Sequence, residues 1–275
     1  YALFANVSLG NLFMAGFVPG FVMVITLGIM TFFITCMRKY PRGAKYSMKE
    51  VFKAFCSSFW ALLSPVLLIG GIWGGMVTPT EAALVCVLYS LFIGLFVYKD
   101  ITLKEIPEIL IESFKAIAPI CAINVASVVL AFIINYEGLD SVIYNLIANV
   151  TTNKYVFLLI VNVIFLIAGC FVDANSAMYI FIPIMYPVAQ QLGINLVHFG
   201  VLSTVNLAIG QVTPPVGVNL FVAIGVADKL QGLKDKTKVT IASMSKAVWP
   251  MILACVISLL IVTYVPFFST VFLKG

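Results

Sequence analysis

Long apolar runs recur along this chain of 275 residues, and they constrain its fold more than any other feature. They lie at residues 17–37, 59–77, 82–97, 116–134, 202–226 and 248–268. A helix needs about 20 consecutive apolar residues to cross the hydrocarbon core of a bilayer. Charged residues make up only 10% of the chain, against about 25% in an average soluble domain. We therefore predict an all-α polytopic membrane protein.

Lysine and arginine gather in three connections between the apolar runs. These connections hold 14 of the 16 basic residues: Arg38, Lys39, Arg42, Lys45, Lys49 and Lys53, then Lys99, Lys104 and Lys115, then Lys229, Lys234, Lys236, Lys238 and Lys246. Cytoplasmic loops of membrane proteins carry an excess of basic residues. We therefore expect the three connections in the cytoplasm, and residues 78–81 and 137–154 on the outside.

This topology requires residues 155–191 to begin and end on the outer side of the membrane. The segment is interrupted at residues 169–176, Gly-Cys-Phe-Val-Asp-Ala-Asn-Ser, which are too polar for a helix that faces lipid. Each flanking apolar arm has only about 14 residues, too few to cross the bilayer alone. We predict a re-entrant helical hairpin, because a single crossing would place the third basic connection outside.

A second interruption lies in the apolar run at residues 206–219, Asn-Leu-Ala-Ile-Gly-Gln-Val-Thr-Pro-Pro-Val-Gly-Val-Asn. Pro214 and Pro215 lack a backbone donor and disfavour the helical conformation of the residue before each. Carbonyl groups are then left without helical partners, which a membrane protein tolerates only where they line a cavity or meet a polar group. We predict a helix over residues 199–227 that is broken here.

Two interrupted segments are typical of discontinuous helices that face each other near the bilayer midplane of a secondary transporter. Their carbonyl oxygens can coordinate a hard cation such as sodium. The helix ends near Asn175 and Pro215 offer amide donors and a positive dipole to a carboxylate. Neither interruption contains lysine or arginine. An anionic substrate would therefore depend on helix ends, amides, hydroxyls and bound sodium.

Asp173 and Thr213 are the side chains in these interruptions from which we expect a function. Asp173 is a lone carboxylate in an apolar stretch, and an intramembrane charge costs about 2.5–3.5 kcal/mol on insertion scales. It either serves the transport site or caps the second hairpin helix by accepting from the amides of Asn175 or Ser176, and the two roles are compatible. Thr213 either ligates sodium or caps its half-helix, and we expect sodium ligation.

Residue content argues against an enzyme. The single histidine, His198, excludes an HExxH site, and the chain lacks GxSxG, CxxC and a second intramembrane aspartate. We expect His198 to be structural. A Gly-rich phosphate loop ending in Gly-Lys-Ser/Thr is also missing, so the energy for transport would come from an ion gradient. The alternative function is a gated ion channel built on a re-entrant hairpin.

Two local patterns have a structural interpretation. Residues 78–81, Thr-Pro-Thr-Glu, predict a capped helix start with Glu81 as the capping-box residue. Residues 103–114 place apolar and acidic side chains on opposite faces, which predicts a helix lying in the membrane interface.

Several motifs resemble those of one transporter family. They are residues 70–83 (Gly-Gly-Ile-Trp-Gly-Gly-Met-Val-Thr-Pro-Thr-Glu-Ala-Ala), Asp173-Ala-Asn175, His198-Phe-Gly200, and residues 206–217 with their Gly-x-x-Thr-Pro-Pro-x-Gly element. In order and spacing the chain resembles, over essentially its whole length, the large membrane subunit of tripartite ATP-independent periplasmic (TRAP) transporters.

The resemblance implies an elevator-type transporter with two inverted repeats, of which this chain holds the second and the end of the first. Residues 1–53 would contain the last helix of the first repeat and a cytoplasmic connection, and residues 54–115 the scaffold helices and an interfacial arm helix. Residues 116–275 would form the transport-domain half, with hairpin 155–191, broken helix 199–227 and a final transmembrane helix. We expect the first hairpin to lie outside this sequence.

The resemblance also implies site residues and partners. The implied sodium ligands are Gly169, Gly210, Thr213 and Val216. We expect the substrate beside Asp173 and Asn175 of the hairpin tip and Pro214 and Pro215 of the break. The implied partners are a small membrane subunit and a periplasmic solute-binding protein that delivers a small organic anion, such as sialic acid or a C4-dicarboxylate. The setting would be the bacterial inner membrane, with lipid around the spans, Na⁺ as the coupling ion and no nucleic-acid partner.

Overall fold

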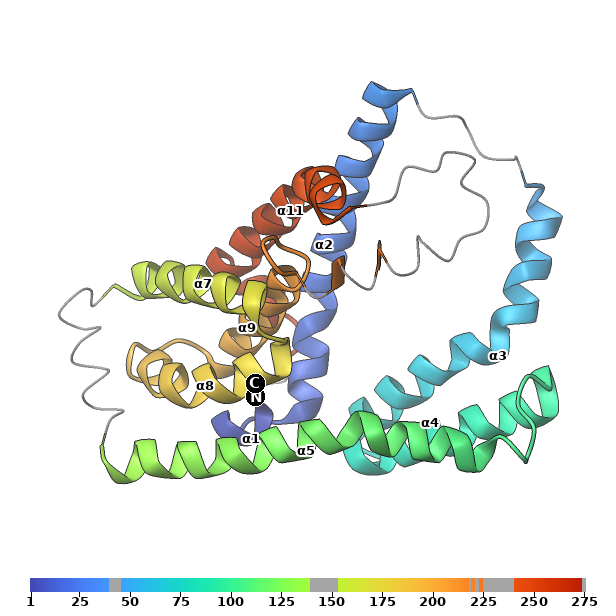
Figure 1. The fold of residues 1–275 in the computed structure, drawn as a ribbon, viewed down its shortest axis with the longest axis horizontal. Helices are drawn as coiled ribbons and strands as arrows, with labels where there is room; N and C mark the ends of the chain where they lie inside the picture. The colour runs from blue at the N-terminus through green and yellow to red at the C-terminus, as the bar shows by residue number, and fades with distance from the viewer. Residues whose placement is uncertain (40–45, 139–152, 218, 221–222, 225–239, 274–275) are drawn as a thin grey trace. The chain divides into compact units, whose positions relative to one another are not determined.

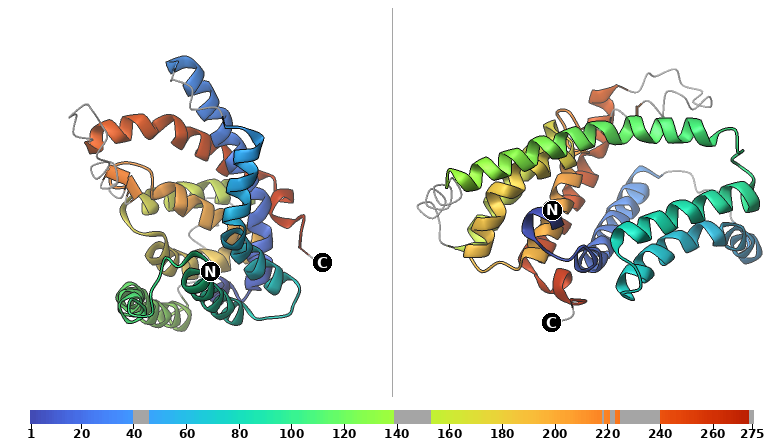
Figure 2. Two further views of the ribbon diagram at one scale, coloured as in Figure 1. Left: turned by 90° about the vertical axis from the view of Figure 1, so that its right-hand side faces the viewer. Right: turned by 90° about the horizontal axis from the view of Figure 1, so that it is seen from below.

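The computed structural model describes residues 1–39, 46–138, 153–217, 219–220, 223–224 and 240–273. Across these ranges the chain is helical and contains no strand, which confirms the predicted all-α class (Figures 1 and 2). The helices are α1 (Ala2–Ala5), α2 (Leu9–Arg38), α3 (Met48–Trp73), α4 (Pro79–Phe92), the π-helix η1 (Ile93–Tyr98), α5 (Ile106–Tyr136), α7 (Lys154–Phe171), α8 (Ala174–Gln191), α9 (Leu196–Gly210), α11 (Ile241–Tyr264) and α12 (Phe267–Thr270).

Five helical segments of the described ranges are long and apolar enough to cross a membrane. They are α2, α3, the segment Pro79–Tyr98 formed by α4 and η1, α7, and α11, and they contain 18 to 30 residues each. Large apolar side chains such as Phe32 of α2 and Phe52 of α3 are exposed on these helices. Such surfaces suit lipid or another protein rather than water. The polytopic prediction is confirmed.

The chain forms two compact units, described here separately: Tyr1–Arg38 with Ala122–Gly275, and Lys39–Cys121. In the unit Lys39–Cys121, α3 and α4 pack side by side and run antiparallel. The hydroxyl of Tyr89 donates to the carbonyl of Trp60, and that of Tyr98 to the carbonyl of Ser57, both at 2.8 Å. Tyrosine hydroxyls of α4 and η1 therefore bind carbonyl groups of α3.

The helix start at residues 78–81 follows the predicted capping chemistry. Thr78 Oγ1 accepts from the Glu81 amide, and the Glu81 carboxylate accepts from the Thr78 amide at 2.7 Å, so the capping box is confirmed. Just before α5 the Glu105 carboxylate accepts from the amide and the hydroxyl of Thr102, and the Glu105 amide donates to the Thr102 carbonyl. α5 then continues without interruption to Tyr136. The predicted interfacial helix at 103–114 and the apolar run at 116–134 therefore belong to one helix.

The unit containing α2 and α7 to α12 has its core between the α7–α8 hairpin and α9. Phe157, Phe165 and Phe199 are fully buried there, with the rings of Phe157 and Phe199 stacked at 6.2 Å between centroids. α2 packs along α11. Ala15 of α2 and Val262 of α11 share a second buried cluster with α9. This core holds the interrupted segments in place.

The predicted helical hairpin is present, but its arms are longer than the predicted 14 residues, because α7 and α8 contain 18 residues each. The prediction that each arm is too short to cross a membrane is wrong for α7. α7 ends at Phe171 and α8 begins at Ala174, so that only Val172 and Asp173 join them. α8 runs back beside α7 (Figure 1). That both outer ends of this hairpin lie on one side of the membrane stays a prediction.

The predicted helix break is also present. α9 ends at Gly210, residues 211–217 are not helical, and helical conformation returns at Asn219 and Leu220. The rest of the predicted span to residue 227 falls largely outside the described residues, as do Arg42 and Lys45 of the first basic connection and residues 229–238 of the third.

Candidate functional site

The two interruptions meet at a contact between two glycines. A Cβ built on Gly210 would lie 2.6 Å from the Cα of Gly169 and 2.8 Å from its carbonyl carbon. A Cβ built on Gly169 would lie 3.0 Å from both the Gly210 Cα and the Leu207 carbonyl oxygen. Any larger residue at either position would push the helices apart. Glycine at both therefore brings the carboxyl-terminal ends of α7 and α9 together backbone to backbone.

The broken segment folds back onto the end of α7. The amide of Gly217 donates to the carbonyl of Cys170 at 3.1 Å, and Gly217 has a φ of +56°. This left-handed conformation favours glycine. The amide of Asn219 donates to the carbonyl of Gln211 at 3.1 Å, and its side-chain amide donates to Gln211 Oε1 at 3.3 Å. The segment is therefore a closed loop that rests on the hairpin.

Thr213 lies inside this loop and is buried. Its amide donates to the Gly210 carbonyl at 2.9 Å, and its hydroxyl donates to the Ile209 carbonyl at 2.7 Å. A hydroxyl that donates still has oxygen lone pairs with which to bind a cation. The local bond to Ile209 agrees with the structural alternative for Thr213, and sodium ligation remains compatible with it.

The structure thus brings three of the four residues with an implied sodium role together. Gly169 and Gly210 are in contact, and the Thr213 amide donates to the Gly210 carbonyl. The fourth residue, Val216, is half-buried and precedes Gly217, whose amide binds α7. In the described residues no group of three or more His, Cys, Asp or Glu side chains could hold a metal. The atoms at this site that could coordinate a cation are carbonyl and hydroxyl oxygens, the ligand type that hard cations prefer. The residues fit sodium better than a transition metal.

Asp173 is the helix cap of α8. Its Oδ2 accepts from the amides of Asn175 at 3.0 Å and Ser176 at 3.2 Å, and its Oδ1 accepts from the Ser176 hydroxyl. The capping alternative for Asp173 is therefore observed. Two of the first α8 amides, expected to be available to a substrate carboxylate, are bound by this aspartate instead. The negative charge of Asp173 also lies at the positive end of the α8 dipole.

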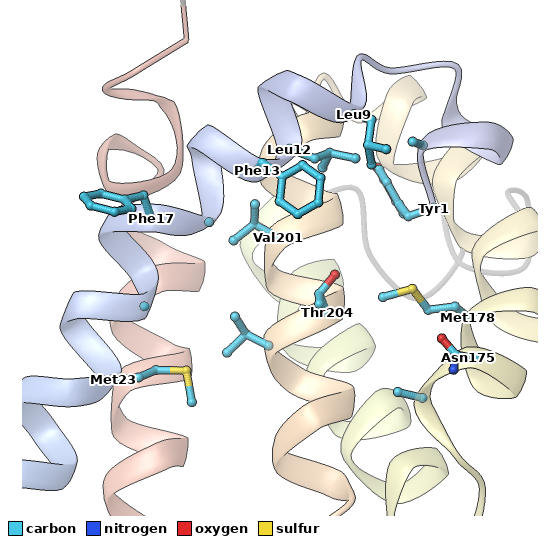
Figure 3. A pocket seen from close by; sticks show the side chains of 15 residues that line it. Tyr1, Leu9, Leu12, Phe13, Phe17, Met23, Asn175, Met178, Val201 and Thr204 are labelled. Carbon is cyan, nitrogen blue, oxygen red and sulfur yellow. The ribbon is translucent and has the colours of Figure 1, made fainter. Parts of the chain in front are cut away.

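Asn175 lines an apolar cavity of about 610 Å³ in the same unit. Figure 3 shows Asn175, Met178 and Thr204 together with side chains of α2 and Tyr1 around this cavity. The lining consists of Tyr1, Ala2, Leu9, Leu12, Phe13, Gly16, Phe17, Gly20, Met23, Ala174, Asn175, Met178, Val201, Thr204 and Val205. Of the four expected substrate residues, Asn175 belongs to this lining and Asp173, Pro214 and Pro215 do not. Pro214 is half-buried and Pro215 exposed, joined by a cis peptide bond.

A buried polar contact between helices was missed by the sequence analysis. The side-chain amide of Asn206 on α9 donates to both the carbonyl and Oδ1 of Asn162 on α7, each at 2.9 Å. Asn162 Nδ2 donates to Thr263 Oγ1 on α11 at 3.0 Å. Asn162 is a lone amide in an otherwise apolar stretch. An intramembrane polar residue of this kind is itself a signal of a partner or a function.

His198 has the structural setting that its sequence position predicts. The ring is buried, with Nδ1 3.1 Å from Ser269 Oγ and Nε2 3.2 Å from the carbonyl of Thr263. Both ring nitrogens are thus engaged within the fold. The histidine joins the start of α9 to the end of α11 and to α12.

Comparison with known proteins identifies relatives of this chain. The chain matches the family model described as tripartite ATP-independent periplasmic transporter, DctM component, over residues 1–268. It is 39% identical over 265 residues to a C4-dicarboxylate TRAP transporter large permease protein of Rhodobacter capsulatus, covering 96% of this chain and 58% of that protein. It is 35% identical over 269 residues to a sialic acid TRAP transporter large permease protein of Vibrio cholerae, covering 98% of this chain and 61% of that protein.

A third relative is an isethionate TRAP transporter permease protein of Oleidesulfovibrio alaskensis, 37% identical over 267 residues, with 97% of this chain and 40% of that protein covered. The chain therefore spans about three-fifths or less of the length of these relatives. All three are named as permeases and none as an enzyme. Because the family model is matched over nearly the whole sequence, the chain belongs to the DctM family of TRAP transporter components.

Proposed function

We propose that the protein containing this chain imports a small organic anion into a bacterium together with sodium. The observation that carries the proposal is the contact of Gly169 with Gly210 beside the loop at 211–217. It gathers backbone carbonyls and the Thr213 hydroxyl at the meeting point of two interrupted helices, the arrangement in which transporters bind coupling ions. The proposed sodium ligands are Gly169, Gly210, Thr213 and Val216.

Sodium supplies both energy and charge in this proposal. One elementary charge that crosses 100 mV is worth about 2.3 kcal/mol. The interruptions at 169–176 and 210–219 contain no lysine or arginine. An anion bound beside them would therefore be stabilised by sodium, by hydroxyl and amide groups, and by helix ends not already capped. Asn175 is the proposed polar contact for the substrate, because it faces the cavity of Figure 3.

Family membership supports the remaining parts of the proposal. The chain is a multi-pass protein of the bacterial inner membrane. The proposed cargo is a C4-dicarboxylate or sialic acid, the compounds for which two of the relatives are named. A periplasmic solute-binding protein would deliver the cargo, and a small membrane subunit would accompany the chain. An elevator movement of the hairpin and broken helix would carry the site across.

Uptake by the full-length complex tests this function. The complex is reconstituted in vesicles with its solute-binding protein and offered labelled sialic acid or C4-dicarboxylate. We expect saturable uptake of one of them without ATP, only when an inward sodium gradient is present. Undiminished uptake with choline in place of sodium would contradict sodium coupling. Non-saturable flux with no fixed ratio of sodium to substrate would favour a gated channel instead.

A further inference from the structure

A buried polar contact joins α7 and α9, and the proposed function does not yet account for it. Asn206 is fully buried, and among the described residues none donates to its Oδ1. A buried amide oxygen without a donor is unfavourable, and such atoms are rare in folded proteins. An apolar residue of the same size would avoid this cost. The asparagine is therefore explained by what its Nδ2 does.

The orientation of the Asn206 amide follows from its surroundings. Its Nδ2 lies 2.9 Å from the main-chain oxygen of Asn162 and 2.9 Å from Asn162 Oδ1. A reversed amide would place an oxygen against that main-chain oxygen, which cannot turn into a donor. The nitrogen must face α7. Two hydrogen bonds from one side chain therefore join α9 to a defined residue of α7.

This contact lies on the same helix faces as the two glycines of the site. Asn206 precedes Gly210 by four residues, and Asn162 precedes Gly169 by seven, so each pair is separated by whole turns along one face. The interface between α7 and α9 thus contains a polar contact at one level and the backbone contact of Gly169 with Gly210 at another. Sliding one helix along the other would disturb both together.

We propose that Asn206 and Asn162 are positioning residues for the sodium site. Their hydrogen bonds set the position of α9 along α7, and thereby the distance between the backbone groups at Gly169 and Gly210. The bond from Asn162 Nδ2 to Thr263 Oγ1 extends this restraint to α11. The inference rests on the proposed sodium coupling, but it assigns a role to side chains that do not touch the ion.

Replacing both asparagines distinguishes positioning from stability. In Asn162→Leu/Asn206→Leu the paired amides and the unpaired oxygen disappear together, and replacing both partners of a buried hydrogen bond by apolar groups of similar shape is nearly neutral for folding. We expect the full-length complex to fold and to unfold at a slightly lower temperature than the wild type, because the buried Thr263 hydroxyl loses its Asn162 partner. The half-saturating sodium concentration should rise about 3- to 10-fold, in line with the loss of the two hydrogen bonds that join α9 to α7. The substrate KM at saturating sodium should change less than about twofold on the same reasoning.

Ser203→Ala is the matched control. Ser203 is also fully buried on α9, but its hydroxyl donates only to the carbonyl of Phe199 in its own helix, at 2.7 Å. The control should keep the wild-type half-saturating sodium concentration. If the double variant does not reach the membrane, Thr263→Val tests the positioning role in its place. It removes the acceptor of Asn162 Nδ2 at constant shape and should raise half-saturating sodium in the same direction by a smaller factor.

The outcomes separate this inference from the proposed function. The wild type can show sodium-dependent uptake while the double variant, or Thr263→Val if that is the variant measured, has the same half-saturating sodium concentration. This result would overturn the positioning role and leave the proposed function intact. Wild-type uptake that ignores sodium would overturn both. A rise in half-saturating sodium in the asparagine variant and not in Ser203→Ala would support the positioning role.

Discussion

The α-carbon of Gly169 lies so close to Gly210 that a Cβ on the latter would be 2.6 Å from it. This contact connects the end of the hairpin helix α7 to the last residue of α9. The loop that follows then binds the Cys170 carbonyl through Gly217. Because backbone meets backbone at this point, small changes of side-chain volume should have large effects on the site.

The first prediction concerns that volume. Gly210→Ala should lower the free energy of unfolding by about 1–3 kcal/mol, the usual cost of overpacking, and should greatly reduce uptake because α7 and α9 must separate. Gly28→Ala on α2 is the control, because a Cβ there would meet nothing within 4 Å. Thermal unfolding and uptake of the reconstituted complex measure both effects. Equal stability of Gly210→Ala and Gly28→Ala would contradict the observed contact.

The second prediction concerns the hydroxyl of Thr213. Thr213→Val keeps the shape but removes one oxygen, at a cost of about 1–3 kcal/mol for an unpaired buried polar group, or about 5- to 150-fold in sodium affinity. Uptake should fall at low sodium and partly recover at high sodium, because sodium and substrate binding are linked. Thr213→Ser retains the oxygen and should stay near wild type. An unchanged half-saturating sodium concentration in Thr213→Val, at matched protein levels, would remove Thr213 from the ion site.

The third prediction separates the effect of the Asp173 hydrogen bonds from the effect of its charge. Asp173→Ala should destabilise the complex by about 0.5–2 kcal/mol, since the amides of Asn175 and Ser176 lose their acceptor. Asp173→Asn should keep most of this stability, because asparagine is an equally good helix cap. Thermal unfolding of the two variants decides. Equal loss in both would mean that the charge at the helix end matters more than the hydrogen bonds.

The fourth prediction is a pH dependence at the start of α5. Hydrogen bonds from the amide and hydroxyl of Thr102 lower the pKa of the exposed Glu105 carboxyl below its ordinary value of 4.5. A lowered folded-state pKa means that this stabilisation is complete above the unfolded-state pKa and is lost as the pH falls through the folded-state pKa. Titration of Glu105 by NMR should show the lowered pKa, and Thr102→Ala should raise it. If the pKa of Glu105 is the same in Thr102→Ala as in the wild type, the Thr102 hydroxyl does not contribute to lowering it.

The fifth prediction tests the hairpin topology. In a background without the native cysteines, Lys154→Cys at the start of α7 and Gln191→Cys at the end of α8 should both react with an impermeant reagent from the periplasmic side. Lys49→Cys in the first basic connection should react only after the membrane is permeabilised. Labelling of Lys154→Cys and Gln191→Cys from opposite sides would show that the segment crosses the membrane.

The elements of this fold were readable from the sequence because each depends on local chemistry. Apolar length indicates the membrane helices, and proline and glycine between residues 210 and 217 indicate the break. The capping box at Thr78 and Glu81 needs only four consecutive residues. Motif resemblance then indicated the family, which the comparison confirmed.

Contacts between distant residues were decided by the tertiary structure alone. Nothing local in the sequence pairs Asn162 with Asn206, or closes the contact of Gly169 with Gly210, because such pairs depend on how α7 and α9 cross. The same holds for Asp173, from which we expected a function, because its role as the cap of α8 was established only when its oxygens were located on the α8 amides. Helix formation is a property of neighbouring residues, whereas the meeting of two helices depends on packing across the whole unit.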